Sequence, residues 1–364
     1  MQVDHLSTPA LVVDLDVLER NLDGMAHYCR EHGLGLRPHT KTHKTLEVSR
    51  MQLERGAVGL TVAKAGEAEV MAAAEPAEML VAYPIYGAEK LRRLAGLARS
   101  RRILLSLDSE VTASELSAAA AAQGVTFGVL VEFDTGLHRC GLAPGPDCLK
   151  LAEVVRALPG LEFRGLMTYP GSIGGAAESR TAEARRVSAA VEIAIRSFEG
   201  ARIPVEIVSA GSTPSAWLSH EIKGVTEIRP GTYVYNDLNT YYQGLCSLED
   251  CAARVVTTVI STAVPGRMML DAGSKTLSSD LLSFGPKEGY GRVVEAPEAT
   301  LFKLNEEHGH VDISHARRAF KVGDVLTLIP NHVCTCVNMH DELFLARRGE
   351  VCGSWRIAAR GKIR

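Results

Sequence analysis

The stretch from Leu36 to Lys44, LRPHTKTHK, carries a dense set of possible acids, bases and nucleophiles and follows a strand-like run. A lysine at the end of a strand can be held in a desolvated, cation-rich pocket, which lowers its pKa from about 10.4 towards neutrality and makes the amine a nucleophile. Lys41 is therefore a candidate for forming a Schiff base with a carbonyl compound. A solvated basic turn is the alternative interpretation of this stretch.

Length and composition indicate a globular protein that acts on small molecules. The 364 residues are 46% hydrophobic, which is enough for a large core and, at the usual domain size, for two domains. The formal net charge of -3 provides no basic excess of the kind that binders of nucleic acids or membrane surfaces show. No apolar run approaches the ~20 residues of a membrane-spanning helix, and residues 1–10 lack a signal-peptide pattern.

The 8 cysteines are scattered along the chain, as is typical of free thiols in a reducing compartment. Together with the composition, this predicts a cytoplasmic protein without a nucleic-acid or membrane partner.

Short apolar runs alternate with longer helix-like runs between residue 34 and about residue 240. The runs with the character of buried strands are 34–37, 59–63, 78–83, 102–107, 126–132, 162–167, 205–209 and 224–228. Strands that alternate with helices in this way predict a TIM-type (β/α)8 barrel, with a doubly wound open sheet as the alternative.

Polar residues follow these predicted strands, and (β/α)8 barrels carry their chemistry at the carboxyl ends of the strands. These residues include Lys41, His43, Lys64, Tyr83, Asp108, Asp134, Arg139 and Tyr169. Two late strand ends, 209–213 (SAGST) and 229–232 (RPGT), offer small residues whose N–H groups can surround an oxyanion. Ordinary turns are the alternative, but a lysine after the first strand and phosphate loops after the last two together suit pyridoxal 5'-phosphate.

Strand-like pieces with turn signals replace the helical periodicity after about residue 245. They are 253–263, 267–270, 291–295, 325–329, 336–338 and 342–347. The pattern predicts a mainly-β domain. We set the barrel at residues 12–245 and the β domain at residues 246–364, which residues 1–11 would complete.

The segment from Asn331 to Cys334 is the sharpest local signal in this second domain. On a strand, side chains two positions apart point to the same face, so His332 and Cys334 could bind one metal ion at about 2.0 to 2.3 Å. A His-x-Cys pattern also occurs by chance, and Cys336 offers a rival pairing with His332. Thiolate favours zinc by ligand softness, whereas an aspartate in its place would suit manganese or magnesium.

Six short motifs resemble, in order and over essentially the whole chain, those of fold-type III pyridoxal-phosphate enzymes, and among them the family of D-threonine aldolase, D-serine dehydratase and 3-hydroxy-D-aspartate lyase. The motifs are TPALVVD (8–14), RPHTKTHK (37–44), GLHRCG (136–141), RPGTY (229–233), DAGSK (271–275) and PNHVC (330–334). The resemblance implies an alanine racemase-like barrel, a C-terminal mainly-β domain and a homodimer with a shared active site.

The resemblance also implies roles for individual residues. Lys41 would hold pyridoxal 5'-phosphate covalently and move the substrate's α-proton, with Lys44 as the alternative. Arg139 would lie near the phenolic oxygen of the cofactor and Tyr169 beside its ring, while His43 is a further catalytic candidate. A divalent metal near the cofactor would be held by His332 and Cys334.

Arg229 would approach the pyridine nitrogen, where a cation keeps that nitrogen unprotonated. An ion pair of Arg229 with Glu227 or Asp237 is the alternative. The residues that would hold the phosphate are Gly211, Ser212, Thr213, Gly231 and Thr232.

A metal at this place could polarise the β-hydroxyl of a D-amino acid, so that either the Cα–Cβ bond breaks or the hydroxyl leaves. No histidine occurs between His138 and His220, although a base for the hydroxyl proton would be expected near residues 169–175. Its absence and the cysteine ligand favour dehydration, whereas the motifs as a whole favour an aldolase.

We therefore predict a lyase of β-hydroxy-D-amino acids that depends on pyridoxal phosphate and a divalent metal and resembles D-threonine aldolase. A D-serine or 3-hydroxy-D-aspartate dehydratase is the second prediction. An amino-acid racemase is the third, and a non-enzymatic carrier of the cofactor is an alternative of another class.

Overall fold

The computed structural model describes residues 1–286 and 289–364, which form two compact units. The barrel unit comprises residues 24–41, 46–231 and 362–364, and the β unit comprises residues 1–23, 42–45 and 232–361. The domain bounds inferred from the sequence, 12–245 and 246–364 with 1–11, stay a prediction. None of the helices in the described part of the chain has the length and apolar content needed to cross a bilayer.

Parallel strands of the barrel unit form one eight-stranded sheet between Gly35 and Ile228, a part of the chain that the structure describes throughout. In sheet order they are β2 (Gly35–Leu36), β9 (Glu227–Ile228), β8 (Ile207–Ala210), β7 (Leu161–Met167), β6 (Phe127–Glu132), β5 (Arg102–Leu107), β4 (Glu78–Val81) and β3 (Leu60–Val62).

The two ends of this strand order meet, because His39 pairs with Thr61 in a parallel bridge and the Thr61 N–H donates to the Pro38 carbonyl at 2.9 Å. The sheet is therefore closed, which confirms the (β/α)8 barrel and excludes the open sheet.

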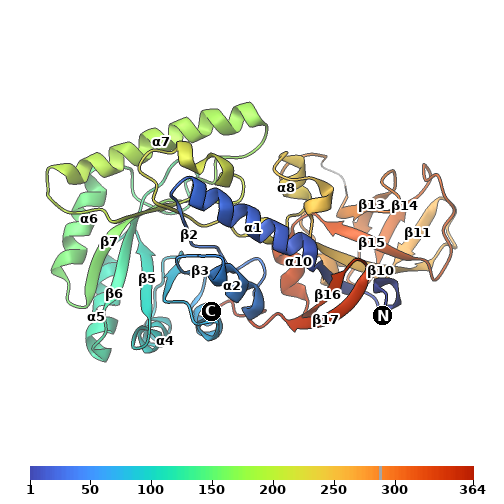
Figure 1. Ribbon diagram of the computed structural model, residues 1–364, viewed down its shortest axis with the longest axis horizontal. Coiled ribbons are helices and arrows are strands. Elements are labelled where there is room, and N and C mark those ends of the chain that lie inside the picture. Colours follow the sequence, from blue (N-terminus) through green and yellow to red (C-terminus); the bar gives the residue numbers. More distant parts are fainter. Residues whose placement is uncertain (287–288) are drawn as a thin grey trace. The chain divides into compact units, whose positions relative to one another are not determined.

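Helices follow the strands, and α4 to α7 lie on the outside of the barrel (Figure 1). Their bounds are α2 (Leu46–Glu54), α3 (Ala65–Met71), η2 (Ala72–Ala74), α4 (Ala88–Ala98), α5 (Glu110–Gln123), α6 (Pro146–Ala157), α7 (Ala177–Glu199) and η3 (Ala216–Glu221), with α1 (Leu15–Glu31) before the first barrel strand. In α5 the Ser109 hydroxyl caps the start by accepting from the Thr112 N–H, and Gly124, at φ 62°, ends the helix.

The strand faces away from the helices pack against one another. Leu80, Leu104, Leu130 and Met167 come from four neighbouring strands and form one cluster. Paired residues of neighbouring strands share a face, so the register of β6 to β9 sets Glu132, Met167, Ser209 and Glu227 in one row. Buried charged groups therefore share the barrel interior with this cluster.

The β unit is built on a nine-stranded mixed sheet among the described residues. The main path runs β13 (Thr300–Leu304), β14 (Gly309–Asp312), β11 (Arg267–Leu270), β10 (Ala253–Ser261), β1 (Ala10–Asp14), β16 (Glu342–Arg347) and β17 (Glu350–Arg356), while β15 (Val325–Pro330) pairs with β10 and with β12 (Gly291–Val293). Strand β1 lies antiparallel to β10 and parallel to β16. The N-terminal strand thus completes the mainly-β domain.

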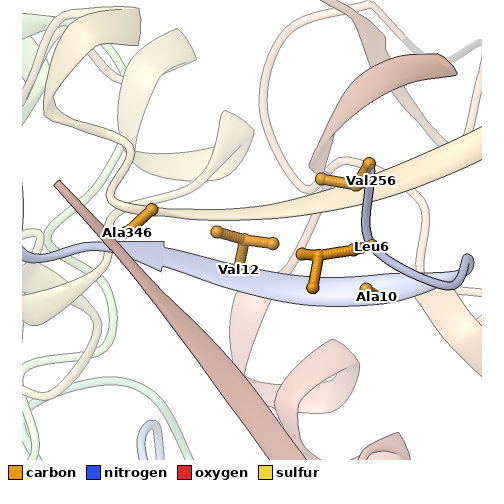
Figure 2. Packing of buried hydrophobic residues seen from close by; sticks show 5 residues of the cluster. All are labelled: Leu6, Ala10, Val12, Val256 and Ala346. Atoms are coloured by element: carbon orange, nitrogen blue, oxygen red, sulfur yellow. The ribbon is translucent and has the colours of Figure 1, made fainter. Parts of the chain in front are cut away.

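Figure 2 shows the core that this insertion creates. Leu6, Ala10 and Val12 from the N-terminal segment pack against Val256 on β10 and Ala346 on β16. The remaining short elements of the unit are η1 (Val3–His5), η4 (Thr232–Val234), α8 (Leu238–Tyr242), η5 (Leu248–Asp250), α9 (Ser274–Leu277) and α10 (Val333–Met339).

The prediction of a strand at 336–338 was wrong, because these residues belong to helix α10. The buried residues of α10 are Val333, Cys336 and Val337, a spacing of three and one that fits a helix rather than the two-residue period of a strand. Strands β13, β14 and β17 were not predicted, since their apolar residues do not alternate regularly.

A substitution at Gly165 would test the close packing of β7 against β8. Gly165 lies on β7 at φ 147°, and an added Cβ would overlap the backbone of Ile207 on β8. We expect G165A to destabilise the protein by about 3 kcal/mol, through strain and displacement of β8. The matched control is G96A on α4, where a Cβ meets nothing within 4 Å and a gain of up to about 1 kcal/mol is expected. Urea unfolding midpoints measure both, and equal midpoints for the two variants would contradict this packing.

Candidate active site

Arg229 follows β9 and is held rigidly inside the barrel unit. It is 5% exposed, its Nη1 donates to Ser209 Oγ at 2.6 Å, and its Nη2 donates to the Thr168 carbonyl at 2.8 Å. Burial lowers the pKa of Arg229 to about 10, although Glu227 and other neighbouring charges act against it. The guanidinium thus remains a cation at neutral pH. The described contacts show no direct ion pair with Glu227, because the Ser209 hydroxyl lies between the two groups.

The turn after β8 has the small residues that the phosphate prediction required. Gly211 adopts φ 86°, and a Cβ there would lie 2.9 Å from the Ile228 side chain, so only glycine fits. Ser212 and Thr213 are buried beside it. The Ser212 N–H donates to Ser215 Oγ at 2.9 Å, a contact that the sequence did not indicate. Gly231, the other glycine of the predicted site, is buried after β9.

Lys41 follows the first barrel strand and is exposed, and its N–H donates to His39 Nδ1 at 3.3 Å. The desolvated pocket expected around this lysine stays a prediction. The alternative, Lys44, is 7% exposed, so Lys41 is the more accessible amine. His43 is completely buried in the β unit, where its Nδ1 accepts a hydrogen bond from the Thr45 N–H at 3.2 Å.

Arg139 and Tyr169, predicted to flank the cofactor, are brought together by the loops after β6 and β7. The guanidinium carbon of Arg139 lies 4.5 Å from the centre of the Tyr169 ring, within the range of a cation–π contact. Asp134 organises the first loop by accepting from the N–H groups of Gly136 and His138. Although burial opposes it, these donors hold the pKa of Asp134 below its usual range.

Glu132, the last residue of β6, was missed by the sequence analysis. It is 3% exposed, and burial raises its pKa although Arg229 and Arg139 act in the opposite direction. The signal in the sequence was an acidic residue that ends the otherwise apolar run FGVLVE.

His332 and Cys334 do not lie on a strand, so that part of the metal prediction was wrong. His332 is the residue before helix α10, and Cys334 lies in the first turn. The two side chains nevertheless lie together. Burial alone would lower the pKa of His332, but the Cys334 thiolate and the Asp237 carboxylate beside the ring raise it to about 11. The surroundings of the imidazole are therefore strongly negative and favour a cation.

Asp237 supports His332 from behind. Its carboxylate Oδ2 lies 3.1 Å from His332 Nδ1 and accepts from the Val333 N–H at 3.0 Å. The aspartate is 0% exposed. A carboxylate on one ring nitrogen commonly orients a metal-binding histidine through the other, so the arrangement leaves Nε2 for a ligand. From the sequence, Asp237 was predicted only as a possible partner of Arg229.

The Cys334 sulfur lies among hydroxyl groups of the β unit. Thr42 Oγ1 is 3.2 Å from it and Thr232 Oγ1 is 3.7 Å from it, so Thr232, a predicted phosphate ligand, lies beside the metal candidate. Cys336, the rival ligand, is buried and donates to the Thr276 carbonyl at 3.3 Å, and burial raises its pKa to about 12. It therefore stays a neutral thiol, which favours Cys334.

The donor chemistry at these places fits the two groups that the resemblance implies. Imidazole and thiolate suit zinc, although residues 1–286 and 289–364 contain no cluster of three or more His, Cys, Asp or Glu side chains arranged for a metal. An accessible lysine, a fixed guanidinium and a glycine turn without a Cβ suit pyridoxal phosphate.

The fold is shared with solved structures of low sequence identity. Alanine racemase from Clostridium difficile superposes with a TM-score of 0.72 at 14% identity, over 96% of this chain and 99% of the racemase. The chain therefore has the alanine racemase fold, which joins a barrel to a mainly-β domain.

The chain belongs to the family described as alanine racemase, N-terminal domain, which matches residues 13–239, followed by a putative serine dehydratase domain at residues 252–346. D-threonine aldolase from an Arthrobacter species is 33% identical over 98% of this chain and 93% of the aldolase. D-threo-3-hydroxyaspartate dehydratase from a Delftia species is 35% identical over 90% of this chain and 91% of the dehydratase. The crystal structure of D-threonine aldolase from Filomicrobium marinum superposes with a TM-score of 0.92 at 30% identity, over 100% and 98%.

These relatives confirm the family resemblance seen in the sequence, and the family is one of pyridoxal-phosphate-dependent enzymes. Two further solved structures are variants of a D-threo-3-hydroxyaspartate dehydratase. One replaces a histidine by alanine, and the other replaces a cysteine two positions later and is described as metal-free.

The contact between Asp237 and His332 is expected to raise the affinity for a metal ion. D237N removes the charge behind His332 and is expected to weaken zinc binding about 10- to 100-fold. Competition with a chromogenic chelator measures it. T240A is the matched control, because Thr240 shares the cap of α8 with Asp237 but lies off the His332 contact. Zinc affinity unchanged in D237N, or lowered equally in T240A, would contradict this role.

Proposed function

We propose that the protein is a lyase of β-hydroxy-D-amino acids that depends on pyridoxal phosphate and a divalent metal and cleaves its substrate to glycine and an aldehyde. The observation that carries the proposal is the His332 and Cys334 pair, backed by Asp237, in a chain whose relatives act on D-threonine and on 3-hydroxy-D-aspartate. The histidine and cysteine varied in the related dehydratase are two positions apart, as His332 and Cys334 are, and the cysteine variant is described as metal-free, which supports this pair as metal ligands. A homodimer with a shared site and a cytoplasmic location rest on the sequence alone.

Lys41 would hold pyridoxal 5'-phosphate and move a proton at the substrate's α-carbon. Bound in this way, the cofactor supplies an electron sink for the charge that develops there. Arg229 would meet its ring nitrogen, and Arg139 and Tyr169 would lie beside the ring. The phosphate ligands would be Gly211, Ser212, Thr213, Gly231 and Thr232.

His332 Nε2 and Cys334 Sγ would hold the metal, preferably zinc, with manganese or magnesium as alternatives. The chemistry that such an ion supplies is polarisation of the substrate's β-hydroxyl. The hydroxyls of Thr42 and Thr232 beside Cys334 would orient the thiolate.

Dehydration to a 2-oxo acid and ammonia is the second candidate. It is favoured by Cys334, since a cysteine variant of a related dehydratase is described as metal-free, and by the absence of histidine from residues 169–175. Elimination needs a base only at the α-carbon, where Lys41 would act. A racemase or a cofactor carrier has no use for the metal pair, which makes both less well supported.

Product analysis separates these reactions. We expect D-threonine to yield glycine and acetaldehyde, with turnover lost after chelation and restored by zinc or manganese, because the metal polarises the β-hydroxyl. Ammonia with 2-oxobutanoate would identify a dehydratase instead, and a product inverted only at the α-carbon would identify a racemase. A chain that binds pyridoxal phosphate and converts neither D-threonine, D-serine nor 3-hydroxy-D-aspartate would be a carrier.

Chemical trapping identifies the cofactor lysine. Borohydride reduction of the loaded protein, followed by peptide mass spectrometry, is expected to place the pyridoxyl mass on Lys41, since this amine is exposed and Lys44 is buried. K44A serves as the control and is expected to be labelled like the wild type. A label on Lys44 in the wild type, or full labelling of K41A, would overturn the assignment.

A further inference from the structure

A continuous chain of hydrogen-bonded polar groups starts at the buried Arg229 and ends at Glu78, which is partly exposed. Arg229 donates to Ser209 Oγ, and Ser209 Oγ donates to Glu227 Oε1, both at 2.6 Å. Arg37 binds Glu227 with two donors, Nε at 2.9 Å and Nη2 at 2.8 Å. The same Nη2 donates to Glu78 Oε1 at 2.7 Å. Cations and carboxylates therefore alternate in the order Arg229, Glu227, Arg37 and Glu78. The Ser209 hydroxyl lies between Arg229 and Glu227.

The direction of each hydrogen bond in this chain is fixed. A hydroxyl has one proton, and Ser209 gives it to Glu227, because the carboxylate can only accept. The lone pairs of Ser209 are then left for the Arg229 guanidinium, which can only donate. The charge of Glu227 thus orients Arg229 through one intervening hydroxyl.

Arg37 holds the Glu227 carboxylate with two donors of one guanidinium. Two such charge-assisted bonds fix the orientation of a carboxylate as well as its distance. Both residues are buried, so solvent does not screen the pair. Removing either partner would leave an uncompensated charge in the interior.

The register of the barrel strands sets the positions of these polar groups. Ser209 and Glu227 are paired residues on β8 and β9, and Gly35 on β2 is the partner of Glu227 on its other side. Gly59 leaves room for Arg37, since a Cβ there would lie 2.5 Å from Arg37 Nη1. The groups are therefore held by backbone pairing and not by a mobile loop.

We propose that Ser209, Glu227 and Arg37 are positioning residues that fix the Arg229 guanidinium against the ring nitrogen of the cofactor. The proposal rests on the proposed function, because it takes Arg229 to face that nitrogen. None of the three needs to touch the cofactor. If the hold on Arg229 is lost, the ring nitrogen takes up a proton more readily and draws electron density from the lysine nitrogen.

The test compares pyridoxal phosphate binding by S209A and the wild type. S209A breaks the connection between Arg229 and Glu227 without removing a charge. We expect the dissociation constant for pyridoxal phosphate to rise about tenfold, as for the loss of one charge-assisted hydrogen bond. We also expect the pH midpoint of the visible absorbance band to fall by roughly half a unit or more, because a protonated ring nitrogen makes the lysine nitrogen less basic. The charged groups that also face Arg229 are Glu227, Glu132, Arg37 and Tyr169, and they are unchanged in this variant.

S117A is the matched control. Ser117 is a buried serine of the same unit whose hydroxyl donates one hydrogen bond to the Pro159 carbonyl at 2.7 Å. We expect its dissociation constant to stay within about twofold of the wild type, as for a side chain remote from the ligand. E227Q, which removes the charge and keeps the shape, is expected to change the pH midpoint in the same direction as S209A.

Suppose that the wild type binds pyridoxal phosphate and shows the band. If S209A then has the same dissociation constant and pH midpoint as S117A, the positioning role of Ser209, Glu227 and Arg37 is overturned and the proposed function is left intact. A wild type without any visible band would overturn the proposed function itself. Because S209A retains every charge, it decides the question even if E227Q does not fold.

Discussion

Closure of the eight-stranded sheet is the constraint on which the barrel unit depends. The parallel bridge between His39 and Thr61 joins the first barrel strand to the second, so no strand edge is left open. In a closed parallel barrel the carboxyl ends of all strands form one ring. Lys41, Arg139 and Arg229, far apart in the sequence, are therefore presented at the same end. Closure also removes the inner faces from water, so an interior polar group without a partner within the barrel costs free energy.

The barrel could be predicted because each strand is a short apolar run between helix-like segments. The predicted range 102–107 coincides with β5 (Arg102–Leu107), whereas 224–228 was too long because Gly224, at φ 86°, leaves the strand conformation before β9 begins. The β unit was harder to predict. Its strands depend on partners from both ends of the chain, and the start of α10 has too few residues for a helical period to show against an apolar background.

Candidate site residues could be proposed from the sequence only where residue type and position at a strand end carried the information. Arg229 and the glycine turn at Gly211 are of this kind. Asp237 precedes its partner His332 by 95 residues, and nothing local to either residue indicates the contact. Ser209 and Glu227 are likewise connected only by the register of β8 and β9. Sequence patterns therefore predicted the groups that would face ligands, while the groups that hold them in place emerged from tertiary pairing.

Each unit holds one candidate ligand-binding group by the same kind of contact. Arg229 in the barrel unit is hydrogen-bonded to Ser209, and His332 in the β unit is hydrogen-bonded to Asp237. An arginine free in solution has about 2 kcal/mol of rotamer entropy to lose when it binds. Here that loss occurs on folding, where strand pairing and helix capping offset it. A ligand bound by such groups would order little that is not already ordered, which raises affinity and precision together. The buried carboxylates Glu227 and Asp237 thus hold Arg229, through Ser209, and His332 in place without being exposed themselves.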